Sequence, residues 1–132
     1  MAQVPNINPQ AFDKVSEIAS SSDDRPVLML NLNTYFHGQS TMSADAYEDY
    51  NAAIDGILRE VKGEILWRSP MHGQPVAKQN VDEILAIWYS SHQAFVKIKD
   101  APSSAHFAEA KNKVFKPAII HRSDPYTIER TP

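Results

Sequence analysis

The run from Val27 to Tyr35 most constrains the fold of this chain, because it reads as a buried strand that carries two amide side chains. Alternate side chains of a strand share a face, which places three leucines on one side and a mixed set on the other. The mixed side consists of Val27, Met29, Asn31, Asn33 and Tyr35. We expect the leucine side to meet helices and the mixed side to meet a cavity. Asn31 and Asn33 then either bond to neighbouring backbone and water or contact a ligand.

The size, charge and residue usage of the chain exclude several classes of function. With 132 residues and no cysteine, it fits one domain that has no disulfides, no thiolate nucleophile and no sulfur-ligated metal. Its start lacks the features of a secretion signal, and no apolar run is long enough to span a bilayer. Its net charge is −3, and we expect the one basic cluster, Lys111, Lys113 and Lys116, to be a solvated helix face. We therefore expect a cytoplasmic protein with neither a membrane nor a nucleic acid as partner.

Hydrophobic periodicity and turn residues divide the chain into helices and strands. They predict first a leading helix capped by Asn8, a strand over 25–36, and a helix that starts after Ser43 and ends in a left-handed Gly63. Strands over 64–68 and 81–90 follow, then helices on either side of Pro102, and a last strand over 119–122 and 126–128. The order strand, helix, strand, strand, helix, strand is the split βαβ plan of ferredoxin-like domains. We therefore expect an α+β fold with a four-stranded antiparallel sheet and helices on one face.

The second face of this sheet needs a partner. Met29, Leu66 and alternate residues of the third strand would form an apolar patch larger than a soluble monomer usually tolerates. Two sheets paired into a closed barrel bury both patches and remove the sheet edges. We therefore expect residues 25–132 to form a homodimer, a dimeric α+β barrel, and residues 1–24 to form an N-terminal extension with the extra helix.

Three stretches of the sequence carry a family resemblance. They are residues 27–32, the turn Lys62-Gly63, and the strand-to-helix junction over 86–95, which reads Ala-Ile-Trp-Tyr-Ser-Ser-His-Gln-Ala-Phe. Together they resemble the thirteen-thirty family of domains of unknown function, in the dimeric α+β barrel superfamily, over about residues 25–121. Trp88 and Ser90 depart from that pattern, standing where a carboxylate and a proline are common. The resemblance implies a dimer with a ligand cavity between sheet and helices or within the barrel, and no particular reaction.

Histidines are the first candidates for catalysis, because imidazole moves protons near neutral pH. His37 and His72 lie in predicted loops, and His121 lies on the last strand, so any of the three is a candidate. We expect His92 and His106, at the starts of helices, to be solvated. No two histidines have the spacing of a helical metal pair, and we predict no metal site.

Other candidates lie on the strands. Arg68 ends the second strand and Glu83 begins the third, so Arg68 either forms a cross-strand ion pair or binds a substrate carboxylate. Trp88 and Tyr89 either pack in the core or hold a flat ligand between their rings.

We therefore predict a small homodimeric enzyme, independent of any cofactor, that acts by acid–base chemistry on an aromatic or polyketide-like carbonyl compound, as a cyclase, lyase or isomerase. A histidine would move the proton, and Asn31, Asn33 or Tyr35 would steady the enolate or phenolate oxygen. The alternative is a non-catalytic dimeric module, small-molecule-binding or stress-related, in which the same amides only position a hydrophobic or aromatic ligand. A cofactor-free quinol oxygenase is a third class that the residue types do not separate from the first.

Overall fold

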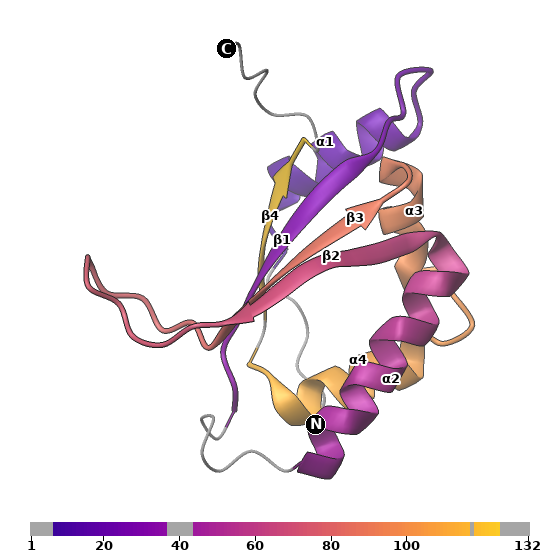
Figure 1. The fold of residues 1–132 in the computed structure, drawn as a ribbon. Helices are drawn as coiled ribbons and strands as arrows, with labels where there is room; N and C mark the ends of the chain where they lie inside the picture. The colour runs from indigo at the N-terminus through magenta and orange to yellow at the C-terminus, as the bar shows by residue number, and fades with distance from the viewer. Residues whose placement is uncertain (1–6, 37–43, 117, 125–132) are drawn as a thin grey trace, which may run out of the picture.

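A four-stranded antiparallel sheet with helices packed on one face forms the framework of the protein (Figure 1). The structure is a computed structural model and describes residues 7–36, 44–116 and 118–124. Its elements are α1 (Pro9–Ala19), β1 (Val27–Asn33), α2 (Ala44–Val61), β2 (Gly63–Pro70), β3 (Glu83–Tyr89), α3 (His92–Val96), the 3-10 helix η1 (Lys97–Asp100), α4 (Ser104–Val114) and β4 (Ile119–Ser123). The strands lie in the order β2-β3-β1-β4. The predicted α+β, ferredoxin-like fold and its extra N-terminal helix are thereby confirmed.

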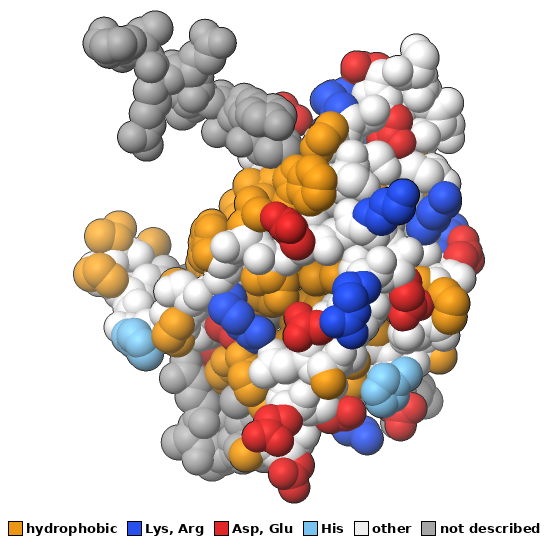
Figure 2. Space-filling model, turned by 45° about the vertical axis from the view of Figure 1, so that its right-hand side comes forward, with side chains coloured by type: hydrophobic (Ala, Val, Ile, Leu, Met, Phe, Trp, Pro, Cys, Tyr) orange, Lys and Arg blue, Asp and Glu red, His pale blue; other side chains and the backbone are white. Residues whose placement is uncertain are grey.

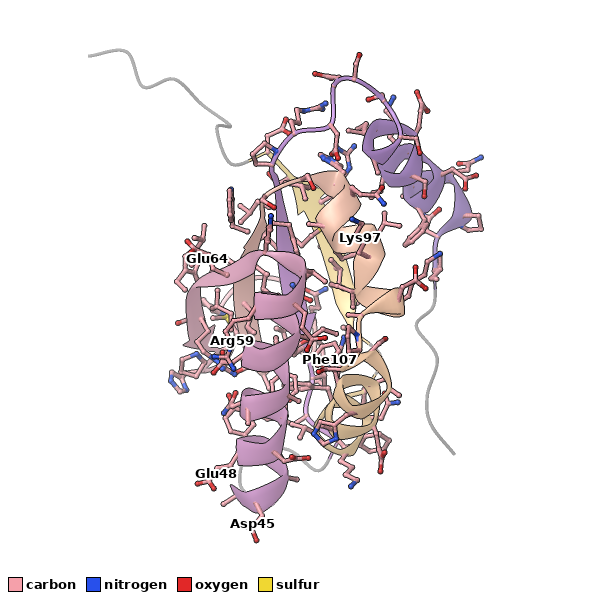
Figure 3. All side chains as sticks on the ribbon, turned by 90° about the vertical axis from the view of Figure 1, so that its right-hand side faces the viewer. Asp45, Glu48, Arg59, Glu64, Lys97 and Phe107 are labelled. Atoms are coloured by element: carbon pink, nitrogen blue, oxygen red, sulfur yellow. The ribbon has the colours of Figure 1, made fainter. Side chains whose placement is uncertain are left out.

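The helices form a layer over the sheet. α2 and α4 lie side by side in front of it (Figure 3), and α1 packs against α3, where the rings of Phe12 and Phe95 have centroids 6.5 Å apart. Ser91 caps α3 by accepting a hydrogen bond from the Ala94 backbone N–H at 3.0 Å. Asn8 occupies the cap position of α1, although its side chain makes no capping bond. No helix in the described part of the chain is long and apolar enough to cross a membrane.

α2 ends one residue earlier than its glycine suggested. Lys62 takes the left-handed conformation, with φ of 61°, and Gly63 begins β2. The prediction that Gly63 is the left-handed cap is therefore wrong. Glycine is needed here for a different reason, since a Cβ at position 63 would lie 3.0 Å from Leu58 Cδ2 and 3.0 Å from Tyr89 Cδ1. The start of β2 is thus crowded by Leu58 of α2 and Tyr89 of β3, and an added Cβ would push one of these side chains aside.

The helices cover the mixed side of β1, whereas we expected them to cover the leucine side. The mixed side faces the helices, where four residues alternate as buried positions: Val27, Met29, Asn31 and Asn33. The leucines lie on the side without helices, each partly exposed. The mixed side can meet the helices because its amides find partners there, Asn31 with the Met29 carbonyl and Asn33 with Glu83. Met29 belongs to the core, and its assignment to the uncovered face is wrong.

The uncovered side of the sheet, called here the open face, is largely apolar. Strand register places Leu28 opposite Trp88 and Leu30 between Ala86 and His121. The face comprises the apolar residues Leu28, Leu30, Leu32, Trp67, Ile84, Ala86, Trp88 and Ile119, together with the polar residues Glu64, Ser69, His121 and Ser123. Trp67 is 50% exposed and Ile119 48%. In Figure 2, hydrophobic side chains gather on the side of the sheet turned away from the charged surface of the helices.

Candidate functional site

A cavity of about 240 Å³ lies between the sheet and helices α2 and α4. We call it the site cavity. Aliphatic and aromatic side chains form most of its wall, among them Ile54, Ile57, Leu58, Ile87, Ile98 and Phe107. Phe107 lies between α2 and α4 (Figure 3), with its ring centroid 6.4 Å from that of Tyr50. The mixed side of β1 thus meets a cavity, as its sequence predicted.

The two amides of β1 line the site cavity and also bond within the protein. Asn31 Nδ2 donates to the Met29 carbonyl at 3.2 Å. Asn33 is 1% exposed, and its Nδ2 donates to Glu83 Oε1 at 3.4 Å. Asn33 Oδ1 is buried and has no hydrogen-bond partner among the described residues. Asn33 therefore carries an unused, buried acceptor at the wall of the cavity.

Glu83 is the centre of a buried polar cluster next to the cavity. It is 3% exposed, and Arg68 Nη2 lies 3.1 Å from each of its carboxylate oxygens. The phenols of Tyr47 and Tyr35 donate to Oε2 at 2.8 Å and 3.3 Å. The expected cross-strand ion pair between Arg68 and Glu83 is thereby confirmed. Burial, and then the charge or hydrogen bond of Glu83, raise the pKa of both phenols, which therefore keep their protons and act as donors.

Lys111 on α4 is a site residue that the sequence reasoning missed. It lines the site cavity, its Nζ lies 5.8 Å from the centroid of the Phe107 ring, and burial lowers its pKa. We expected a solvated helix face, and Lys113 fits it, since it is exposed and pairs with Glu109 at 3.8 Å. Lys116 is exposed as well, but it lies beyond the end of α4 and lines the cavity. The signal was the spacing of 107, 111 and 114, which places Lys111 on the inner side of the helix.

Tyr50 and Tyr89 complete the polar lining with two phenols. Both are buried, at 2% and 4% exposure, and both line the site cavity. Burial raises the pKa of each phenol, so each remains a proton donor at neutral pH. Tyr89 is thus one predicted ligand-binding residue that the structure brings together with Asn31 and Asn33.

The histidines of the described residues lie away from the site cavity. His72 is exposed in the long connection between β2 and β3, which reaches out from the body of the protein (Figure 1). His121 is exposed on the open face, opposite Leu30. His106 is solvated as expected, with its Nε2 3.6 Å from Asp49. His37 lies outside the described residues. Catalytic roles for His37, His72 and His121 stay predictions.

His92 is buried, contrary to our expectation of a solvated side chain. It is fully shielded, at 0% exposure. Its Nδ1 lies 2.8 Å from the carbonyl oxygen of Arg25, and its backbone N–H donates to Asp24 Oδ1 at 2.7 Å. These contacts attach the start of α3 to the segment that precedes β1. Sequence position at a helix start did not reveal them, because the partners come from a distant part of the chain.

Three further candidates do not line the site cavity. Trp88 lies on the open face. Tyr35 stacks on Phe115 with ring centroids 5.4 Å apart and joins the Glu83 cluster. Arg68 donates to Glu83, to Tyr47 and to Asn51 Oδ1. Within the part of the chain that the structure describes, no group of three or more histidines and carboxylates is placed to hold a metal ion.

Comparison with known proteins identifies a shared fold. No family model and no curated protein matches the chain. The crystal structure of RPA0582, a protein of unknown function from Rhodopseudomonas palustris, superposes with a TM-score of 0.71, covering 91% of this chain and 95% of that one at 17% sequence identity. Methylated RPA0582 gives a TM-score of 0.71, covering 95% and 96% of the two chains at 18% identity. This similarity supports the fold alone, and membership of the thirteen-thirty family stays a prediction.

Proposed function

We propose that the protein binds a small aromatic or polyketide-like carbonyl compound in the site cavity and acts on it by acid–base chemistry. The observation that carries this proposal is the cavity itself, whose apolar and aromatic wall holds a few polar groups. Such a wall is typical of small-molecule sites. The volume of about 240 Å³ is below the usual range, which begins at about 300 Å³. A compound with a single ring therefore suits the site.

The charge of the cavity suits a ligand that develops negative charge on oxygen. Lys111 and Lys116 line it, whereas no aspartate or glutamate among the described residues does. Removing a proton next to a carbonyl places negative charge on the oxygen, and a preorganised donor aimed at that oxygen lowers the barrier. The Lys111 ammonium and the Tyr50 phenol are such donors. In this proposal they take the role that the sequence assigned to the β1 amides and Tyr35.

Lys111 is our proposed general acid in place of a histidine. Its pKa is lowered because the amine is buried, and a lysine with a lowered pKa gives up its proton more readily near neutral pH. His72 and His121 lie outside the cavity wall. His37 stays a prediction for the base that removes the proton from carbon.

The open face supports the homodimer as part of this proposal. It is a largely apolar surface that includes two tryptophans, and a second copy of the same face is its natural cover. In a closed barrel of two sheets, Trp88 and His121 would lie inside, which is the second ligand location that the family resemblance implied.

A non-catalytic binding module is the second candidate function. The placement of His72, His92, His106 and His121 outside the cavity wall favours it, because histidine is the usual carrier of protons near neutral pH. In that case the lysines and phenols only position the ligand.

Acetophenone tests both candidates, because it has one ring and one carbonyl. Calorimetry measures its binding, and nuclear magnetic resonance in deuterium oxide measures the exchange of its methyl protons, which acid–base catalysis accelerates. Ala105 and Ala108 are both exposed on α4, but only Ala108 lines the cavity. We expect Ala108→Phe to fill the cavity and abolish binding and exchange, and Ala105→Phe to keep both.

Each outcome has a distinct meaning. Binding that Ala108→Phe abolishes, together with faster exchange by the wild-type protein, supports the enzyme. The same binding without faster exchange supports the binding module. Binding that Ala108→Phe leaves intact would place the ligand elsewhere and overturn the proposed site.

A further inference from the structure

We propose that Glu83 orients the Asn33 amide so that the site cavity selects ligands with a hydroxyl or N–H group, which donates to Asn33 Oδ1. This inference rests on the proposed function and adds the substrate class, a ring compound that carries both a carbonyl and a hydroxyl. Asn33 acts on the ligand directly, and Glu83 is a positioning residue.

The direction of the Asn33 amide follows from the chemistry of its neighbour. A carboxylate accepts hydrogen bonds, so only the amide nitrogen of Asn33 can pair with Glu83 Oε1. The observed pair is Nδ2 to Oε1 at 3.4 Å. The opposite orientation would set the amide oxygen against the carboxylate. Asn33 Oδ1 is consequently the atom left unpaired at a residue that lines the cavity.

Glu83 is itself held from several sides. Arg68 lies 3.1 Å from both carboxylate oxygens, and the phenols of Tyr47 and Tyr35 donate to Oε2. The backbone of Asn33 is fixed as well, because its carbonyl accepts a hydrogen bond from the Asp82 N–H at 2.8 Å. The acceptor therefore has one orientation before any ligand enters, which is what a selective site requires.

A buried acceptor without a partner penalises a ligand that offers it nothing. Asn33 is 1% exposed, so its free oxygen is poorly placed to be satisfied by bulk water. A ligand hydroxyl supplies the missing hydrogen bond, whereas a methoxy group at the same position leaves the oxygen unpaired and takes more space. Sites that hydrogen-bond a substrate hydroxyl discriminate strongly against analogues without it.

The test compares the meta and para hydroxyacetophenones with the matching methoxyacetophenones. For at least one position we expect the hydroxyl compound to bind the wild-type protein about tenfold or more tightly than its methoxy partner. Equal affinities at both positions, for ligands that Ala108→Phe excludes, would overturn this inference and leave the proposed function standing. A panel in which no compound binds contradicts the proposed function and this inference with it.

The variant Glu83→Gln tests the positioning role. A glutamine can donate to Asn33 Oδ1, which lets the Asn33 amide turn over and present its NH₂ group to the cavity. We expect the preference for the hydroxyl compound to fall by at least tenfold and the affinity for the methoxy compound to rise. Glu48→Gln, which changes an exposed carboxylate on α2 away from the site cavity, is the matched control and should keep the wild-type preference.

Unchanged selectivity in a folded Glu83→Gln protein would overturn the positioning role. If that variant does not fold, the wild-type pairs are measured beside Asn33→Leu. This variant removes the acceptor and is expected to bind hydroxyl and methoxy compounds alike. A hydroxyl preference that persists in Asn33→Leu would show that another group reads the hydroxyl.

Discussion

Burial gives a few ordinary side chains of this protein properties that their exposed counterparts lack. Lys111 and Lys113 lie two positions apart on α4, yet only Lys111 lines the site cavity, and burial lowers its pKa. Lys113 is 60% exposed and pairs with Glu109. Burial also raises the pKa of the Tyr50 and Tyr89 phenols above that of a phenol in water. Candidate chemistry is therefore set by where each residue lies in the fold.

The stability of the protein should report the buried Lys111 amine. Its pKa in the folded chain lies below the ordinary value of 10.5, so the unfolded chain binds more protons at pH values between the two. Stability then rises with pH through that window, and the destabilising effect is fully present below the lowered pKa. We expect Lys111→Met to be more stable than the wild type at neutral pH and to lack this share of the alkaline rise.

Urea unfolding at a series of pH values measures the Lys111 effect as the difference between variant and wild type. Lys113→Met, which removes an exposed amine from the same helix, is the control and should follow the wild-type pH dependence. If Lys111→Met and Lys113→Met give the same difference at every pH, the buried amine has no influence on stability.

At the scale of elements, the sequence predicted which segments form helices and strands better than which faces they present. Periodicity identified α2 and the order of helices and strands along the chain, because both depend on local patterns. The open and covered faces of β1 were exchanged, because the sequence alone does not show that Asn33 meets Glu83, fifty positions along the chain. Of the predicted site, Asn31, Asn33 and Tyr89 line the cavity. Lys111 was missed because a lysine on an amphipathic helix usually faces water.

The junction of α2 and β2 gives a prediction at this scale. Gly63→Ala would place a Cβ 3.0 Å from both Leu58 and Tyr89, and we expect the free energy of unfolding to fall by about 1–3 kcal/mol through overpacking. Gly56 lies inside α2, where an added Cβ would meet no other atom within 4 Å. Gly56→Ala should therefore raise the free energy of unfolding by about 0.5–1 kcal/mol.

Urea unfolding of the two alanine variants gives a direct comparison, since the substitution is the same and only the surroundings differ. Equal effects at positions 56 and 63 would contradict the close packing of Leu58 and Tyr89 around Gly63.

At the scale of the whole molecule, the fold has one covered and one uncovered sheet face. The covered face meets α2 and α4 and holds the site cavity. The open face carries Trp67 and Trp88 together with leucines and isoleucines from neighbouring strands. A stable interface between two such faces would bury roughly 1,200–2,000 Å² in total. The homodimer is thus a prediction that follows from the same topology that builds the cavity.

Leu30 is the residue at which to test the homodimer. It lies on the central strand of the open face, between Ala86 of β3 and His121 of β4. A charge at this position costs little in a monomer, because Leu30 is already partly exposed, but it would be buried without a partner in a face-to-face dimer.

Light scattering measures this difference. We expect it to give a dimer for the wild type at micromolar concentration and a folded monomer for Leu30→Lys. Glu48→Lys, which also introduces a lysine, but on the outer side of α2 (Figure 3), should stay dimeric. A wild-type monomer that persists at micromolar concentration would refute the barrel, while the site cavity, built within one chain, would remain open to the acetophenone test.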